Sequence, residues 1–220
     1  MDAGTRFRGR LVGFTRRSEH AGMLQVTIKI DPPERDELGP ADIRAALVDS
    51  VNALAEAARL HVTEALPIHL DKPTPFTMKA IGVRKARPGG RDVEAEVDVL
   101  PLQARYLALE IFGGVRKAGD YATTKLGPLI PGKDAPRNAY GNLPRGYVQR
   151  VMQQPGVRWV KLRPDKPPAL IRRRNGKTQI LALIVEEARY KPRLPFYDLV
   201  EEALSGAPGI VSRRLDGLGS

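Results

Sequence analysis

The sequence predicts an α+β fold, in which a long N-terminal helix packs on a small mixed or antiparallel sheet, with short additional helices and long loops. Three observations predict it. Beginning at Pro40, apolar residues recur every three or four positions over about 25 residues. Short segments that alternate between apolar and polar residues lie on both sides of this stretch. In addition, 19 prolines and 21 glycines divide the remaining chain into short elements.

We expect one folded domain over residues 23–205, because a chain of 220 residues is long enough to bury one sizeable core. Residues 1–22 are basic and are expected to form either an N-terminal arm or an edge strand. Residues 206–220 are rich in glycine and are expected to form a flexible C-terminal tail.

The first two elements follow from periodicity. The segment from Leu24 to Ile30 alternates between apolar and polar residues, which predicts a strand with one buried face. The helix begins at Pro40, which suits the first helical position, and Pro67 is expected to end it near Leu66. A helix of this length, about 38 Å, needs a sheet or a neighbouring subunit to cover its apolar stripe.

Glycine and proline separate the next elements. A strand from about Phe76 to Lys85 and a second from Val93 to Val99 are expected to form a hairpin, because Arg87-Pro88-Gly89-Gly90 lies between them. A short helix is expected from Leu102 to Phe112. The stretch from Gly119 to Asn142 is expected to be a long loop, and such loops in compact proteins usually serve binding.

The clearest hairpin lies further along the chain. Asn175-Gly176 supplies the two positive-φ residues of a type I′ turn between the strands Ala169–Arg174 and Thr178–Glu187. The run from Ile180 to Val185 is expected to be a central strand. A short helix opening at Pro144 and an extended segment Val157–Arg163 are expected before this hairpin, and a helix from Pro195 that buries Phe196, Leu199, Val200 and Leu204 is expected after it.

The formal net charge of +11 is distributed unevenly along the chain. Residues 31–66 contain eight acidic and three basic residues, whereas residues 145–177 contain ten basic residues and one acidic residue, Asp165. Such asymmetry favours nucleic acid, an acidic protein surface or head-to-tail contact between copies of the chain as the partner.

Two interpretations are open for the tip of the expected hairpin, where Arg172, Arg173, Arg174 and Lys177 lie. In the first, these cations contact a nucleic-acid groove, and Trp159 and Tyr147 stack on bases. In the second, the tip is solvated, the tryptophan belongs to the core, and the charge faces an acidic protein surface.

The sequence contains no recognisable catalytic constellation, and we predict no enzymatic activity, no cofactor and no bound metal. It has no cysteine, which excludes disulfides and thiolate metal sites. Nucleotide-binding glycine motifs and a nucleophile elbow are also absent. Two alternatives stand against this prediction. Glu94, Glu96 and Asp98 share one strand face, which is typical of a solvent-facing hairpin but is also compatible with a magnesium or calcium site, and Asp165 is compatible with a metal-dependent nuclease.

Four segments follow the expected long helix in order: Asp71-Lys72-Pro73-Thr74-Pro75-Phe76-Thr77, Arg105-Tyr106-Leu107-Ala108-Leu109-Glu110-Ile111-Phe112-Gly113-Gly114, Asn138-Ala139-Tyr140-Gly141-Asn142-Leu143-Pro144-Arg145-Gly146, and Arg189-Tyr190-Lys191-Pro192-Arg193-Leu194-Pro195-Phe196. Taken together, they resemble a family of phage and prophage minor tail or tail-completion proteins. This family is similar in layout to minor tail protein Z and the head-tail joining proteins.

The resemblance implies a structural virion protein whose subunits form a ring or cap where the tail meets the head. The implied partners are copies of itself and tail-tube, tail-terminator or head-connector proteins, with packaged DNA as a further expected contact and no membrane. The implied location is the virion tail or neck, after assembly in the cytoplasm of a bacterial host. The candidate interface residues are Phe76, Tyr106, Phe112, Tyr140, Arg172, Arg173 and Arg174, whereas Phe196 is expected to be plain core.

Overall fold

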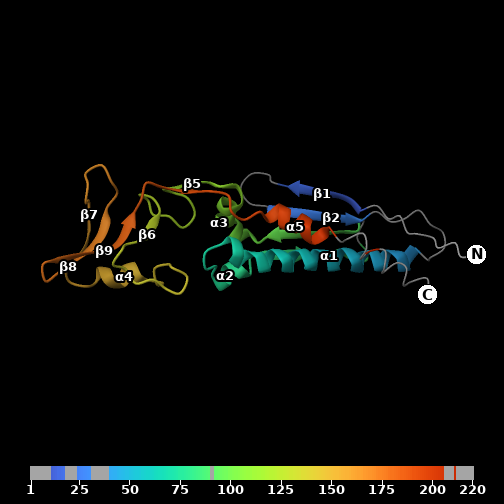
Figure 1. The fold of residues 1–220 in the computed structure, drawn as a ribbon, viewed down its shortest axis with the longest axis horizontal. Coiled ribbons are helices and arrows are strands. Elements are labelled where there is room, and N and C mark those ends of the chain that lie inside the picture. The colour runs from blue at the N-terminus through green and yellow to red at the C-terminus, as the bar shows by residue number, and fades with distance from the viewer. Residues whose placement is uncertain (1–10, 18–23, 31–39, 90–91, 206–210, 212–220) are drawn as a thin grey trace, which may run out of the picture. The chain divides into compact units, whose positions relative to one another are not determined.

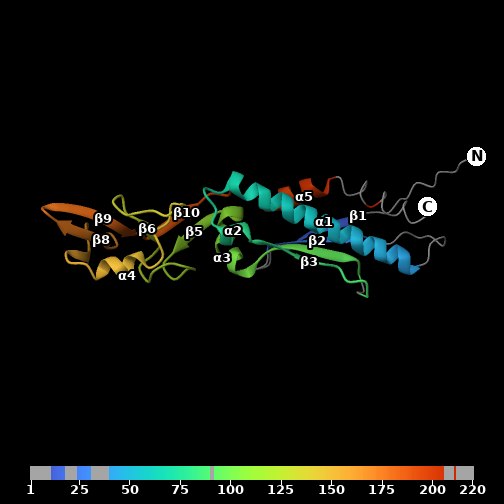
Figure 2. The same ribbon diagram turned by 90° about the horizontal axis from the view of Figure 1, so that it is seen from below.

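The structure is a computed structural model, and it describes residues 11–17, 24–30, 40–89, 92–205 and 211. It confirms the predicted α+β fold, in which a long helix packs on a small antiparallel sheet (Figures 1 and 2). Packing contacts divide the chain into two compact units. Unit 1 comprises Met1–His69, Pro75–Arg105 and Leu194–Ser220, and unit 2 comprises Leu70–Thr74 and Tyr106–Arg193.

Short strands and helices follow one another along most of the described chain. The first eight elements are β1 Leu11–Arg17, β2 Leu24–Ile30, α1 Pro40–His69, α2 Pro75–Met78, β3 Ile81–Arg84, β4 Glu94–Val99, α3 Pro101–Phe112 and β5 Gly114–Lys117. The remaining seven are β6 Leu129–Pro131, α4 Tyr147–Met152, β7 Val157–Val160, β8 Ala169–Arg174, β9 Lys177–Ile184, β10 Glu187–Tyr190 and α5 Phe196–Leu204.

Unit 1 is built on a four-stranded antiparallel sheet in the order β1-β2-β4-β3, and α1 packs against it (Figure 2). The predicted apolar stripe of α1 is confirmed, because Leu47, Val51, Leu54, Ala58 and Val62 are completely buried. The predicted strand Leu24–Ile30 is confirmed as β2. Its neighbour β1 is an edge strand, while residues 1–10 and 18–22 of the basic N-terminal segment lie outside the described residues.

The prediction of the final helix is confirmed. The helix α5 packs along α1, and its four predicted core residues, Phe196, Leu199, Val200 and Leu204, are all buried. Pro195 occupies its N-cap position. Of the glycine-rich segment 206–220, only residue 211 is described.

The expectation that Pro67 ends the long helix near Leu66 is wrong, because α1 continues to His69. A proline within a helix lacks the N–H group that would bond to the carbonyl four residues earlier, which in this helix is that of Thr63. Only one helical hydrogen bond is lost at this position, and Pro67 and Ile68 are exposed in the last turn of the helix, so the proline is accommodated there.

The expected strand from Phe76 to Lys85 is wrong in its first half. Pro75 begins the short helix α2, and the backbone amide of Ala80 then donates to the carbonyl of Thr77 before β3 starts at Ile81. The fixed φ of proline favours the first helical position, which explains the turn. The second half is confirmed, since β3 pairs antiparallel with β4 as a hairpin.

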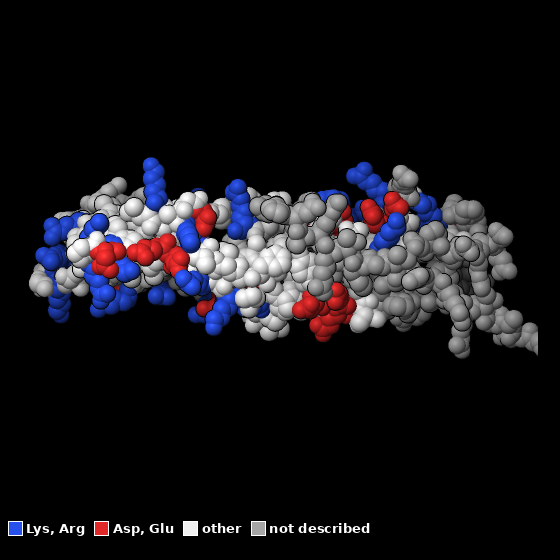
Figure 3. All heavy atoms as spheres, turned by 90° about the horizontal axis from the view of Figure 1, so that it is seen from above, with Lys and Arg blue, Asp and Glu red and all other residues white. Residues whose placement is uncertain are grey.

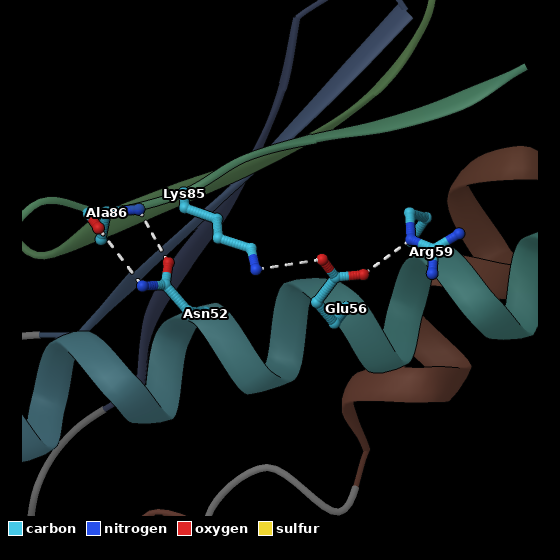
Figure 4. Close-up of polar contacts among 5 residues, drawn as sticks. All are labelled: Asn52, Glu56, Arg59, Lys85 and Ala86. Atoms are coloured by element: carbon cyan, nitrogen blue, oxygen red, sulfur yellow. Dashed lines mark hydrogen bonds and ion pairs between the residues drawn. The ribbon is translucent and has the colours of Figure 1, made fainter.

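Polar side chains of α1 hold the segment that follows β3 (Figure 4). The amide of Asn52 donates to the carbonyl of Ala86 at 3.2 Å and accepts from the backbone N–H of Ala86 at 2.7 Å. One turn later, Glu56 accepts a hydrogen bond from Arg59 at 2.6 Å and pairs with Lys85 at 3.4 Å. The bond from Arg59, together with Lys85, holds the pKa of the Glu56 carboxyl below its usual value.

Unit 2 contains a second four-stranded antiparallel sheet in the order β6-β9-β8-β7. The predicted hairpin is confirmed as β8 and β9, with Asn175 and Gly176 at φ of 50° and 71°. The strand β9 is central, as expected. The short helix α4 supplies Tyr147 and Val151 to a core cluster that also contains Leu170, Leu181 and Ala182.

Three short strands of unit 2 differ from the sequence prediction. The predicted strand Thr178–Glu187 is divided, because β9 ends at Ile184 and Glu187 begins the separate strand β10. The strand β10 pairs with β5, which the sequence did not predict. The expected loop Gly119–Asn142 contains β6, whose three residues pair with the end of β9. These strands are short and pair with strands that lie far away in the sequence, so local sequence patterns do not predict them.

Candidate interface on the basic unit

The positive charge of the protein is concentrated in unit 2. This unit contains 19 lysines and arginines against 7 aspartates and glutamates, whereas unit 1 contains 17 and 18. Figure 3 shows Lys and Arg side chains gathered over the end of the sheet that β7, β8 and β9 form. The net charge of +11 is therefore carried by unit 2.

The acidic side chains of unit 2 are largely engaged elsewhere. Asp120 and Asp134 accept hydrogen bonds from the backbone N–H groups of Lys117 and Ile180 at 2.6 and 2.8 Å. Three glutamates pair with cations: Glu110 with Arg193, Glu186 with Lys166, and Glu187 with Arg189. Within the described ranges, the cations around the β8–β9 turn have no ion pair: Arg158, Arg172, Arg173, Arg174 and Lys177.

The three hairpin arginines do not share one surface. Successive strand residues point to opposite faces of a sheet, so Arg172 and Arg174 lie on one face and Arg173 on the other. The face of Arg172 is also the face of Leu170, which belongs to the core cluster with α4. Accordingly the Nε atom of Arg172 is buried, and it has no hydrogen-bond partner among the described residues.

The two aromatic residues that the first interpretation assigned to base stacking contact the core cluster of unit 2. Tyr147 is buried in the cluster beneath α4, and Trp159 is half-buried and packs against the same cluster. Trp159 pairs across the sheet with Leu170, which directs its ring to the covered face. Burial of Tyr147 argues against its stacking on a base, and the packing of Trp159 favours the interpretation of a core tryptophan.

The aromatic candidates lie on different elements of the two units. Phe76 lies on α2 of unit 1, whereas the other three belong to unit 2. Tyr106 and Phe112 are six positions apart on α3, which places them on different sides of the helix. Phe76, Phe112 and Tyr140 are exposed and Tyr106 is half-buried. Phe196, with no exposed surface, is confirmed as core.

Tyr140 stands on a closed loop that Asn138 holds together. The Asn138 side-chain oxygen accepts hydrogen bonds from the backbone N–H groups of Tyr140 and Asn142, both at 3.0 Å. The backbone N–H of Asn138 donates to the carbonyl of Asn142 at 2.8 Å. This is the local bonding that asparagine favours in turns, and it presents the tyrosine ring outward from a defined backbone.

Two arginines outside the predicted site also organise unit 2. Arg116 donates to the carbonyls of Tyr121 and Ala122 at 3.1 and 2.8 Å, which closes the loop after β5. Arg193 forms a two-pronged ion pair with Glu110, which is mostly buried, and this bond raises the pKa of the Arg193 guanidinium. The contacts of Arg116 are local, whereas Arg193 and Glu110 lie 83 residues apart in sequence, so no local sequence pattern indicates their ion pair.

The three carboxylates of β4 lie in different surroundings. Glu96 pairs with Arg84 of the neighbouring strand at 2.6 Å, and Glu94 is exposed. Burial raises the pKa of the Asp98 carboxyl, while the nearby Arg84 opposes the shift and Glu96 adds to it. Across the described part of the chain, no group of three histidine, aspartate or glutamate residues is placed to hold a metal ion.

In comparisons with known proteins, no family model, no curated protein and no solved structure matches this chain. Among the helices in the described ranges, none has the length and apolar character needed to cross a membrane. The function of this chain is therefore argued from its own residues, foremost the cations around the β8–β9 turn that form no ion pair within the described ranges.

Proposed function

We propose that this chain is a structural virion subunit of a tailed phage or prophage. It completes the tail or connects it to the head by docking to copies of itself in a ring and to neighbouring tail or head proteins. The four segments that resemble tail-completion proteins support the proposal. The observation that carries it is the charge of unit 2, whose cations at the β8–β9 turn have no acidic partner in the described ranges. Charge of one sign without internal partners favours docking to a surface of the opposite sign.

Exposed apolar side chains on unit 2 favour a protein as the partner. Aromatic residues and methionine are enriched in protein interfaces, whereas a nucleic-acid backbone mainly offers phosphates. The large apolar residues of unit 2 that remain exposed are Phe112, Val115, Tyr121, Leu126, Ile130, Tyr140, Met152 and Leu162.

The proposal is tested by measuring the mass of the purified chain in solution, alone and with the tail-tube protein of the same virus. We expect a ring-sized oligomer or a stable complex with the tail-tube protein. The complex should weaken as salt is raised, because salt screens exposed charges. A chain that stays monomeric, ignores the tail-tube protein and binds DNA tightly would contradict the proposal.

Direct nucleic-acid binding is the second candidate. It is favoured by Arg158, Arg173, Arg174 and Lys177, which form no ion pair with any residue that the structure describes. If four phosphates were neutralised, the logarithm of duplex affinity would fall with the logarithm of salt concentration at a slope of about −3.6. Changing Arg172, Arg173 and Arg174 together to alanine should then flatten this slope. Changing Lys125, Lys133 and Lys191 to alanine removes the same charge elsewhere on unit 2 and is the matched control.

A further inference from the structure

The exposed side of the long helix α1 consists of acidic and apolar residues. Among the residues of α1 whose side chains the structure describes, the exposed ones are Asp42, Ala45, Asp49, Ala57, Leu60, Glu64, Pro67 and Ile68. Up to Pro67, successive members of this set lie three, four or eight positions apart, which places them on one side of the helix. We call this stripe, which is about 39 Å long, the outward face of α1.

The outward face carries negative charge that stays uncompensated. Its three acids form no ion pair with any residue that the structure describes. The two arginines of α1 lie on other sides of the helix and are half-buried. Arg59 pairs with Glu56 at 2.6 Å, and Arg44 donates to the carbonyl of Pro88 at 2.7 Å. No cation of the helix therefore belongs to this face.

Two large apolar side chains on the same face are open to solvent. Leu60 is 48% exposed and Ile68 is 80% exposed. Figure 2 looks at unit 1 from the side of α1, and no described helix or strand lies in front of this helix. A phosphate backbone or an anionic lipid surface would be repelled by the three acids. The face therefore suits a protein surface that combines cations with apolar side chains.

Unit 2 carries such a combination. Its strands β7, β8 and β9 contain five cations and no acid. Four of these cations are exposed and form no ion pair within the described ranges: Arg158, Arg173, Arg174 and Lys177. Met152 and Leu162, which are 41% and 53% exposed, lie shortly before and shortly after β7. We call these four cations and two apolar residues the basic end of unit 2.

The chain has a second basic segment, residues 1–10, which is a weaker counterpart for the outward face. It holds three arginines and one aspartate, a net charge of +2, whereas the strands of the basic end hold cations alone. The cations of the basic end are also fixed on paired strands before any docking, which lowers the entropic cost of association. Charge and order together favour the basic end.

We propose that the outward face of α1 in one copy of this chain docks against the basic end of unit 2 in the next copy. The three acids then face the four cations, and the exposed apolar side chains of both surfaces pack beside them. Because the two surfaces differ, the contact is head-to-tail and repeats from copy to copy, which generates a ring or a filament. The inference rests on the proposed function, since it names the surface that the cations around the β8–β9 turn contact.

Self-association of full-length variants, measured by sedimentation velocity, tests the acidic side of the contact. Asp49→Lys and Glu64→Lys should each raise the dissociation constant about fivefold or more, because a lysine then faces the basic end. Lysine is a good helix former, so α1 itself should remain intact. The matched control is Glu94→Lys, which makes the same charge change at an exposed acid of unit 1 outside α1 and should associate like the wild type.

The basic side is tested in the same assay. Arg173→Glu with Arg174→Glu should raise the dissociation constant about tenfold or more. These two residues point to opposite faces of the sheet, so the pair removes charge from both. The control is Lys125→Glu with Lys191→Glu, which makes the same charge change at exposed sites elsewhere on unit 2.

The apolar part of the contact has its own pair of variants. Leu60→Gln should raise the dissociation constant about threefold, because an apolar side chain is then missing from the docked surface. Leu102→Gln changes a comparably exposed leucine on another helix of unit 1 and should have no effect.

A charge exchange makes the test specific to contact between copies. The variant with both α1 changes and the variant with both arginine changes should each associate poorly, whereas their equimolar mixture should associate like the wild type. Every contact between the two variants again joins opposite charges, which a contact within one chain cannot reproduce. If either pair of changes lowers the melting temperature, the single changes Glu64→Lys and Arg174→Glu take its place.

The inference is overturned if two variants that melt like the wild type fail to recover in the mixture. It is also overturned if changing Arg6, Arg8 and Arg10 to glutamate weakens association while the changes at the basic end do not. If the wild type binds the tail-tube protein without associating with itself, or associates in a way that the charge changes leave intact, only the inference fails. If the wild type neither associates nor binds the tail-tube protein, the proposed function fails as well.

Discussion

The side chain of Asn52 makes the two backbone hydrogen bonds that a neighbouring strand would otherwise make. Its amide makes two hydrogen bonds to the backbone of Ala86, which lies beyond the last paired residue of β3. Changing Asn52 to alanine leaves the N–H of the buried Ala86 without this partner, and such a loss costs about 1–3 kcal/mol. We therefore expect the free energy of unfolding, measured by denaturant titration, to fall by about this amount, partly offset by the helix propensity of alanine.

The control for Asn52 is its replacement by aspartate. An aspartate retains the acceptor for the Ala86 N–H but places a second acceptor against the Ala86 carbonyl, so it should recover only part of the loss. Equal stabilities of the alanine variant and the wild type would show that the two hydrogen bonds contribute nothing net.

Asp98 makes the stability of unit 1 depend on pH. Burial raises the pKa of its carboxyl above the usual value of 3.8, so the folded chain holds this proton more tightly than the unfolded chain does. The contribution of this group to stability is therefore largest below pH 3.8 and declines as pH rises through the raised pKa. Asp98→Asn should stabilise the fold more at about pH 7 than at about pH 3, measured by denaturant unfolding.

The exposed Glu94 on the same strand gives the matched variant, Glu94→Gln. If both variants change stability by the same amount at neutral and at acidic pH, burial of Asp98 is not the cause. A loss of stability in Asp98→Asn at neutral pH would mean that attraction to Arg84 outweighs the cost of burial.

At the residue scale, the sequence located the hairpin arginines but not their surfaces. The order of residues was sufficient to place Arg172, Arg173 and Arg174 at the tip of a hairpin, since they follow one another beside an Asn-Gly turn. Their division between two faces depends on the pairing with β7 and on the position of α4, which only the folded chain defines. The packing of Trp159 against the α4 cluster could not be predicted for the same reason, because its extended segment carries no pattern that marks a core face.

Two glycines of unit 2 allow the cost of backbone strain alone to be compared with the cost of strain combined with a steric clash. At Gly176, φ is +71° and an added Cβ would meet nothing within 4 Å, so alanine should cost about 1–2 kcal/mol from its left-handed backbone alone. At Gly127, φ is +132° and the Cβ would lie 1.9 Å from the carbonyl oxygen of Val185. Gly127→Ala should therefore cost more, about 3 kcal/mol, because strain and overpacking add.

Thermal unfolding of the two glycine variants checks this order. The Gly176→Ala variant should melt slightly below the wild type, and Gly127→Ala clearly below both. The reverse order would mean that the backbone around Val185 moves easily, and that the end of β9 is not held at Gly127.

At the element scale, strong periodicity and strong turn residues were sufficient for α1, β2, α3, α5 and the β8–β9 hairpin. The elements that escaped are those stabilised by distant partners. The strand β5 has the sequence Gly-Val-Arg-Lys and pairs with β10, which follows about 70 residues later and reads Glu-Ala-Arg-Tyr. Neither strand alternates clearly between apolar and polar residues, so the pairing cannot be predicted from either one alone.

At the scale of the whole molecule, the chain passes between the two units several times. The charge of each unit therefore cannot be found by counting charges along consecutive residues. Windows along the sequence indicated an acidic helix within basic surroundings. The structure instead divides the charge by unit, because basic residues such as Lys85 lie in unit 1, where they pair with acids of α1. The excess of positive charge in unit 2 then has no internal counterpart of similar size.

The central claim is that this excess charge serves docking between virion subunits. The most direct test is the mass of the wild-type chain in solution at low and high salt, with and without the tail-tube protein. The account predicts a ring-sized oligomer, or a complex with the tail-tube protein, that dissociates as salt is raised. A monomer at every salt concentration that leaves the tail-tube protein unbound would contradict it.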